Sequence, residues 1–152
     1  MCIRDRIRRF QAFGTLFASA GADIYRLDRH PVMSRHPVTP MNEADLGKHL
    51  AAQTHLKVGI VDLVAMKAGE SDYVISRARS AGAKIIAIDV VDDETLIEAG
   101  RIICSDERTV FTVGSQGVEY ALIAQWRARG MLHAQHTAPV LSAAHSPGSQ
   151  RS

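Results

Sequence analysis

The chain has 152 residues, of which 46% are hydrophobic and 22% are charged, and its formal net charge is +2. These values are typical of one soluble globular domain. Acidic and basic residues are interspersed, and no apolar run reaches the length of a membrane span. Neither nucleic acid nor a membrane is therefore an expected partner.

The two cysteines, Cys2 and Cys104, have no spacing typical of a disulfide framework or a metal site. We therefore expect a reduced, cytoplasmic protein without a metal site. His133 and His136 could share a helix face, but no cysteine or acidic residue lies near them to complete a set of metal ligands.

The two ends of the chain differ from its body. The opening string MCIRDR resembles translated adapter read-through, so we interpret residues 1–9 as a non-native or disordered leader. Residues 131–152 mix small, polar and turn residues and predict a disordered tail or linker. Residues 10–130 are the expected domain.

Residues 10–20, FQAFGTLFASA, place apolar side chains at helix-like spacing. Gly14 is unfavourable inside a helix, so the pattern predicts either a short helix or a packed irregular segment. We expect the phenylalanines Phe10, Phe13 and Phe17 to be core contacts and not ligand-binding residues.

Residues 25–46, YRLDRHPVMSRHPVTPMNEADL, contain the tetrad Arg-His-Pro-Val twice. Proline fixes its own φ and pushes the preceding residue towards extended geometry, which predicts a stiff, extended loop with cationic side chains at fixed positions. A guanidinium can grip a carboxylate or phosphate through two hydrogen bonds, and histidine can exchange a proton near neutral pH. Two interpretations stay open: a binding loop for an anionic small molecule, or a solvated connector.

Regular elements follow this loop. Thr39 with Pro40, or else Asn42, could cap a helix that fades near residue 54. Apolar runs at 58–64, 84–89 and 109–113 predict strands. Helices are expected between them, at 74–81 before Gly82, at about 93–103 after a cap at Asp92 or Asp93, and at 118–129.

This alternation is the signature of βαβ units and a parallel sheet covered by helices on both faces. Three strands are few for a complete doubly wound sheet. The predicted fold class is therefore α/β, an incomplete parallel-sheet, three-layer domain with βαβ units.

Ligands of such sheets bind outside the carboxyl ends of the strands, and two features fall there. Asp89 could accept hydrogen bonds from a sugar hydroxyl, or cap the next helix. The turn Gly114-Ser115-Gln116-Gly117 precedes a helix N-terminus that could favour an anion, or it could be a tight turn alone.

The order YRLDRHPVMSRHPVTPMNEADLGKHLAAQT, then the strand run, then VFTVGSQGVEYAL resembles the N-terminal domain of the four-carbon acid sugar kinase family, over about residues 13–129. The resemblance implies a two-domain α/β kinase that phosphorylates tetronate-type sugar acids. Its N-terminal domain would hold the sugar acid, and its C-terminal domain would hold ATP and Mg²⁺.

The resemblance assigns the matching loop and turn residues to the substrate side. They are Arg26, Asp28, Arg29, His30, Arg35, His36, Thr39, Gly114, Ser115, Gln116 and Gly117, with Gln116 at a position where serine is also expected. The family's aspartate-rich opening, its Lys-Asp-Ser-Thr-Leu-Arg-Gly motif and its nucleotide-binding half have no counterpart here. We therefore assign no catalytic residue from the sequence, and we expect no bound cofactor and no activity from this chain alone.

One alternative function is a non-catalytic α/β module that binds a small anion. A dinucleotide-binding domain is disfavoured because no Gly-x-Gly-x-x-Gly follows any predicted strand.

Overall fold

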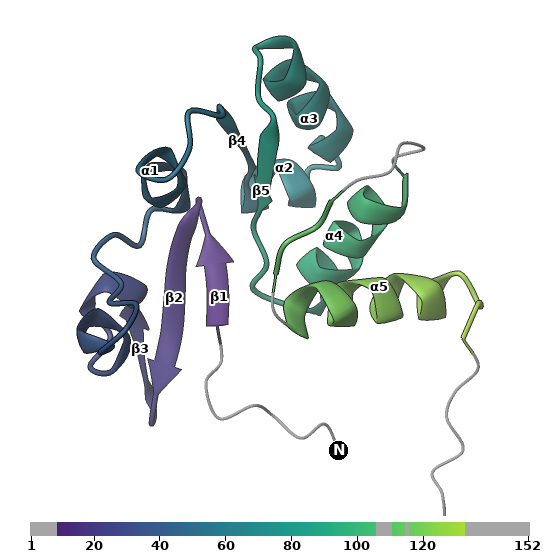
Figure 1. The fold of residues 1–152 in the computed structure, drawn as a ribbon. Helices are drawn as coiled ribbons and strands as arrows, with labels where there is room; N and C mark the ends of the chain where they lie inside the picture. The colour runs from purple at the N-terminus through teal and green to yellow at the C-terminus, as the bar shows by residue number, and fades with distance from the viewer. Residues whose placement is uncertain (1–8, 106–110, 115, 133–152) are drawn as a thin grey trace, which may run out of the picture.

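The computed structural model describes residues 9–105, 111–114 and 116–132. Three antiparallel strands open it: β1 (Arg9–Ala12), β2 (Thr15–Ala20) and β3 (Asp23–Arg26). Two parallel strands follow, β4 (Val58–Val61) and β5 (Ile85–Ile88). Figure 1 shows the antiparallel sheet beside the parallel pair, with most helices on the far side of that pair.

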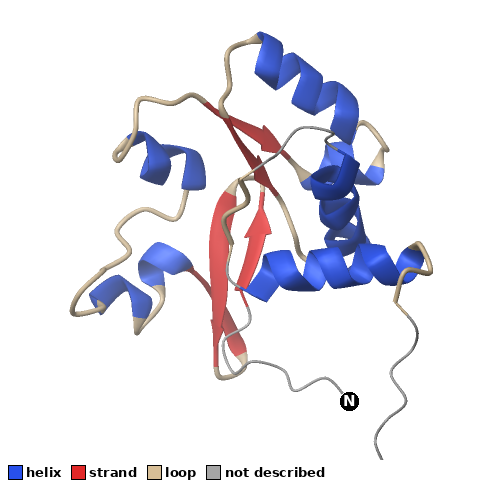
Figure 2. Ribbon diagram, turned by 45° about the vertical axis from the view of Figure 1, so that its right-hand side comes forward, coloured by secondary structure: helices blue, strands red, loops and turns tan. Residues whose placement is uncertain are grey.

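Helices fill the intervals between strands. Two single-turn 3-10 helices, η1 (Leu27–Arg29) and η2 (Met33–Arg35), interrupt the loop after β3. The α-helices are α1 (Leu46–Ala51), α2 (Leu63–Lys67), α3 (Ser71–Ser80), α4 (Asp93–Ser105) and α5 (Gln116–Ala128). β4 contacts both α1 and α3, which lie on opposite sides of the parallel pair (Figure 2). The predicted α/β class with a parallel sheet is confirmed.

The segment predicted as a helix or irregular stretch, residues 10–20, is instead a β-hairpin. β1 and β2 pair in register from Arg9 with Ala18 to Ala12 with Thr15. The helical prediction was wrong because helix-like spacing in a short apolar run also occurs in strands, and only a partner strand distinguishes them. Phe13, expected in the core, is 65% exposed at the hairpin turn.

The predicted third parallel strand is also wrong in its described part. Residues 111–113 have no regular structure, and Phe111 and Val113 are 93% and 83% exposed. An apolar run forms a strand only where it finds hydrogen-bonding partners, and no described strand pairs with this one. Residues 109 and 110 lie outside the described part.

The helix boundary that differs most from its prediction is at the end of the cationic loop, residues 25–46. The helix expected after Thr39 or Asn42 begins at Leu46, and the side chain of Asp45 caps it by accepting a hydrogen bond from the Lys48 amide at 3.0 Å. α2 was not predicted, because a five-residue helix is too short to show a period. Of the two caps offered for α4, the structure shows Asp92, whose side chain accepts a hydrogen bond from the Thr95 amide at 2.9 Å.

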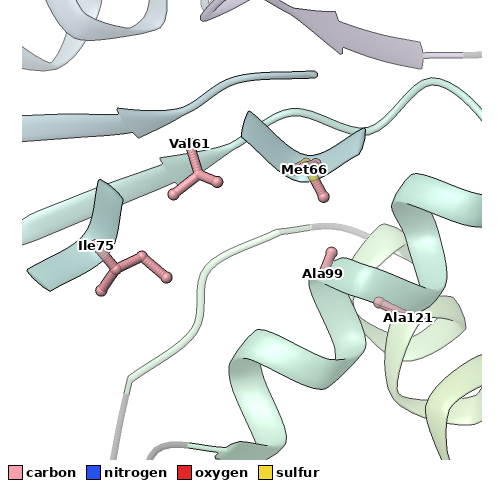
Figure 3. Close-up of a cluster of buried hydrophobic side chains, with 5 residues drawn as sticks. All are labelled: Val61, Met66, Ile75, Ala99 and Ala121. Atoms are coloured by element: carbon pink, nitrogen blue, oxygen red, sulfur yellow. The ribbon is translucent and has the colours of Figure 1, made fainter. Parts of the chain in front are cut away.

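The main core lies between the parallel pair and its helices. Its buried members come from β4, α2, α3, α4 and α5, and Figure 3 shows them converging: Val61, Met66, Ile75, Ala99 and Ala121. A second, smaller cluster of Ala18, Leu27 and Ala44 packs the cationic loop, residues 25–46, against β2. The β1–β3 sheet joins the parallel pair where Gln11 and Val90 exchange two backbone hydrogen bonds.

Candidate functional site

The repeated tetrad is a structural repeat. η1 and η2 each end in an arginine, and each is followed by a histidine and then a proline. The two histidines have nearly the same backbone angles, φ −67° and ψ 131° for His30 and φ −60° and ψ 129° for His36. The extended geometry predicted before proline is confirmed at both positions, although the loop around them forms tight turns.

Each histidine holds its own turn. Nδ1 of His30 accepts hydrogen bonds from the Val32 and Met33 amides at 3.2 and 3.1 Å. Nδ1 of His36 accepts from the Val38 and Thr39 amides at 3.4 and 3.0 Å, and lies 3.2 Å from the Thr39 hydroxyl. The proline after each histidine has no N–H to donate. The histidine ring accepts hydrogen bonds from the backbone amides of the two residues that follow that proline.

His30 differs from His36 in burial. It is 2% exposed, with its ring edge-on to Tyr25 at 6.0 Å. Two N–H donors point at Nδ1, so the ring proton lies on Nε2, which donates to the Ser19 carbonyl at 3.3 Å. Both nitrogens are thus engaged inside the protein. The structure accounts for His30 as a residue that holds the loop on β2.

Arg26 and Asp28 also serve the loop itself. The guanidinium donates to both carboxylate oxygens, at 3.1 Å from Nε and 2.8 Å from Nη2. It also lies 3.6 Å from Glu43. The hydrogen bond to Asp28 is the main reason that the pKa of Arg26 is raised. Arg26 therefore connects the end of β3 to η1 through Asp28, and to the segment before α1 through Glu43.

Arg29 and Arg35 occupy equivalent positions, one residue before each histidine, and both are exposed. Among the described residues, no ion pair joins either arginine to a carboxylate. These two guanidinium groups are therefore the members of the predicted site that are available to an anion from solution.

The glycine–serine turn at residues 114–117, the other part of the predicted site, lies elsewhere in the molecule. Gly114 is exposed, Gln116 begins α5, and Ser115 lies outside the described residues. A Cβ on Gly117 would meet nothing within 4 Å, so no close backbone approach requires that glycine. Figures 1 and 2 both show α5 and the two 3-10 helices on opposite sides of the β1–β3 sheet. The structure does not bring the loop and this turn together.

Asp89 fits neither interpretation offered for it. Its side chain is fully buried and accepts hydrogen bonds from the Phe13 amide, the Gly14 amide at 3.0 Å and the Gln11 side chain at 3.2 Å. The carboxylate therefore clamps the β1–β2 turn onto the end of β5. No local signal could have revealed this, because the partners lie 75 to 78 residues away.

The described residues show neither a membrane-spanning helix nor a cluster of metal ligands. None of their helices is long and apolar enough to cross a membrane. No group of three or more histidine, cysteine, aspartate or glutamate side chains is arranged there to hold a metal ion. His133 and His136 lie outside these residues.

A family model described as a sugar-binding N-terminal domain matches residues 6–122. The chain belongs to this family. The match covers both the repeated turn and the parallel pair. The family description agrees with the resemblance noted from the loop and strand order.

Two curated relatives of this chain are kinases by name. The chain is 49% identical over 131 residues to the 3-oxo-isoapionate kinase of Paraburkholderia graminis, covering 84% of this chain and 27% of that protein. It is 31% identical to the 3-oxo-tetronate kinase of Cupriavidus necator, covering 76% and 27%. The chain thus spans about a quarter of the length of these relatives.

Solved structures show the same fold. A Haemophilus influenzae protein of the DUF1537 family superposes with a TM-score of 0.66 at 23% identity, covering 79% of this chain and 28% of that one. A Salmonella typhimurium LT2 protein superposes with a TM-score of 0.69 at 20% identity, covering 80% and 27%.

Proposed function

We propose that this chain is part of the substrate domain of a cytoplasmic, ATP-dependent kinase that phosphorylates a four-carbon sugar acid or its 3-oxo form. The named activities of the relatives support the reaction class. The family description supports a sugar-type ligand for this part of the protein.

One observation carries the proposal. Arg29 and Arg35 stand at equivalent positions of two His-Pro turns, exposed and without a carboxylate partner among the described residues. The surrounding loop is fixed by His30 and by the Arg26–Asp28 pair, so the two guanidinium groups start from a preorganised backbone. A planar guanidinium binds a carboxylate through two parallel hydrogen bonds, which suits the acid group of such a substrate.

ATP and Mg²⁺ belong, in this proposal, to the part of the relatives that this chain does not span. Phosphoryl transfer depends on positioning and charge stabilisation around the nucleotide and its metal. The described residues contain no group of three or more histidine, cysteine, aspartate or glutamate side chains arranged to hold a metal ion. In this proposal the transfer step belongs to the full-length enzyme, and the partner of this chain is the nucleotide-binding domain of that enzyme.

Calorimetry tests the substrate role. Threonate and erythronate are titrated into the chain and into the Arg29→Ala, Arg35→Ala and Arg127→Ala variants. We expect the affinity to fall about tenfold or more for each loop variant, because each loses one pair of charge-assisted hydrogen bonds to the ligand. Arg127→Ala removes the same charge from an exposed position in α5, and we expect no change for it.

Other outcomes separate the alternatives. Equal affinity for inorganic phosphate and the sugar acids would favour a general anion-binding module. No binding of either acid, or equal weakening by Arg127→Ala, would contradict the substrate role. ATP-dependent phosphorylation of a tetronate by this chain alone would contradict the expectation that it is inactive.

A further inference from the structure

The turn between β1 and β2 holds a bulky residue in an unfavourable backbone conformation. Phe13 has φ +50°, the only positive φ at a described residue other than glycine, and Gly14 follows with φ +70°. Such two-residue hairpin turns strongly prefer asparagine, aspartate or glycine at both positions. A bulky aromatic residue there is strained, and strain of this kind clusters at ligand-binding sites.

The rest of the molecule imposes this conformation. Asp89 is fully buried and accepts both turn amides, those of Phe13 and Gly14. On the other side, the Gly14 carbonyl accepts a hydrogen bond from the Leu46 amide at 2.8 Å. A Cβ on Gly14 would lie 2.7 Å from Cδ1 of Ile60, so the turn is also pressed against β4.

These contacts place the turn between two parts of the molecule, the parallel pair and α1. Asp89 follows β5 directly, so the turn lies at the carboxyl end of the parallel pair, where ligands of parallel sheets bind. Leu46 is the last residue of the cationic loop and the first residue of α1. Phe13 lies between the carboxyl end of the parallel pair and α1. The residue is 65% exposed and belongs to neither hydrophobic core.

We propose that Phe13 is a ligand-contacting residue, and that Asp89 is the positioning residue that holds its ring at the carboxyl edge of the parallel pair. The ring forms an apolar wall for the carbon skeleton of the sugar acid, as aromatic side chains commonly do in small-molecule sites. This inference rests on the function proposed above, and it adds a contact that the cationic loop does not supply.

Three variants test it. Phe13→Asn creates the favoured Asn-Gly turn, so we expect a higher Tm together with at least tenfold weaker threonate or erythronate binding by calorimetry. Phe13→Leu keeps an apolar side chain and the strain, so we expect an unchanged Tm and an affinity within about threefold of the unmodified chain. Asp89→Asn cannot accept from all three donors, and we expect a lower Tm and weaker binding.

The combined outcomes are decisive. A purely structural turn would give Phe13→Asn a higher Tm with unchanged affinity, and that result would overturn the proposal while leaving the substrate role intact. No binding by the unmodified chain would overturn both. If Asp89→Asn does not fold, the ligand affinities of Phe13→Asn and Phe13→Leu still decide whether Phe13 contacts the ligand.

Discussion

At the scale of single residues, the structure separates side chains that look alike in sequence. His30 and His36 occupy the same place in a repeated tetrad and make the same two hydrogen bonds to their own turns. Only His30 is buried, and only His30 donates to β2, through the Ser19 carbonyl. A repeat in the sequence thus encodes a repeated turn, while its surroundings decide which copy anchors the loop.

Replacing His30 tests this distinction. His30→Ala leaves two amides and the Ser19 carbonyl without their partner, and we expect a loss of about 1–3 kcal/mol in the free energy of unfolding, measured with urea. His30→Asn keeps an acceptor near Nδ1 and should recover part of this loss. His36→Ala removes the same turn contacts where water can replace them, and we expect a smaller effect. Equal losses at both positions would contradict the anchoring role.

At the scale of elements, close approaches and not periodicity decide which helices meet. α4 and α5 cross at Gly100, where a Cβ would lie 2.1 Å from the Ala121 carbonyl oxygen and 2.8 Å from Cβ of Gln125. Glycine is therefore required by the helix–helix contact and not by its backbone angles. The sequence pattern indicated the apolar faces of α4 and α5, but it did not indicate the residue at which the two helices cross.

We expect Gly100→Ala to lower the free energy of unfolding by about 1–3 kcal/mol, because the helices must move apart to accept one methyl group. Gly117→Ala in α5 is the matched control. A Cβ there meets nothing within 4 Å, and alanine favours helix by at most about 1 kcal/mol. Thermal unfolding of both variants would measure the difference. A neutral Gly100→Ala would show that the helices pack less closely than described.

At the scale of the whole molecule, charged side chains tie the helices on one side of the parallel pair to each other. Arg101 of α4 binds Glu98 through two bonds of 2.7 and 2.9 Å, and reaches Asp72 of α3 at 3.1 Å. Lys67 of α2 bridges Asp92 and Glu94 at the start of α4. The hydrogen bond from Arg101 is the main cause that lowers the pKa of Glu98.

This lowered pKa gives a pH dependence. Because the folded pKa of Glu98 lies below its ordinary value of 4.5, its stabilising contribution is complete above that pH and is lost as the pH falls through the lowered value. We expect Glu98→Gln to reduce the acid-induced loss of stability by about 1 kcal/mol or less, since the pair is partly exposed. Urea unfolding between pH 3 and 7 measures this, with Glu119→Gln as the charge-matched control. An unchanged pH profile for Glu98→Gln would contradict the role of this ion pair.

The sequence by itself determined the α/β class, the parallel pair and the extended geometry before Pro31 and Pro37, because these follow from local patterns of burial and backbone restriction. It narrowed the cap of α4 to Asp92 or Asp93, and the structure shows that Asp92 is the cap. It also identified the cationic loop. Only the tertiary structure decided that residues 10–20 form a hairpin and that Arg29 and Arg35, unlike Arg26 and His30, face solvent. It alone placed Asp89 under the turn of Phe13. The physical reason is the same in each case: the deciding hydrogen bonds and contacts join residues far apart in the chain.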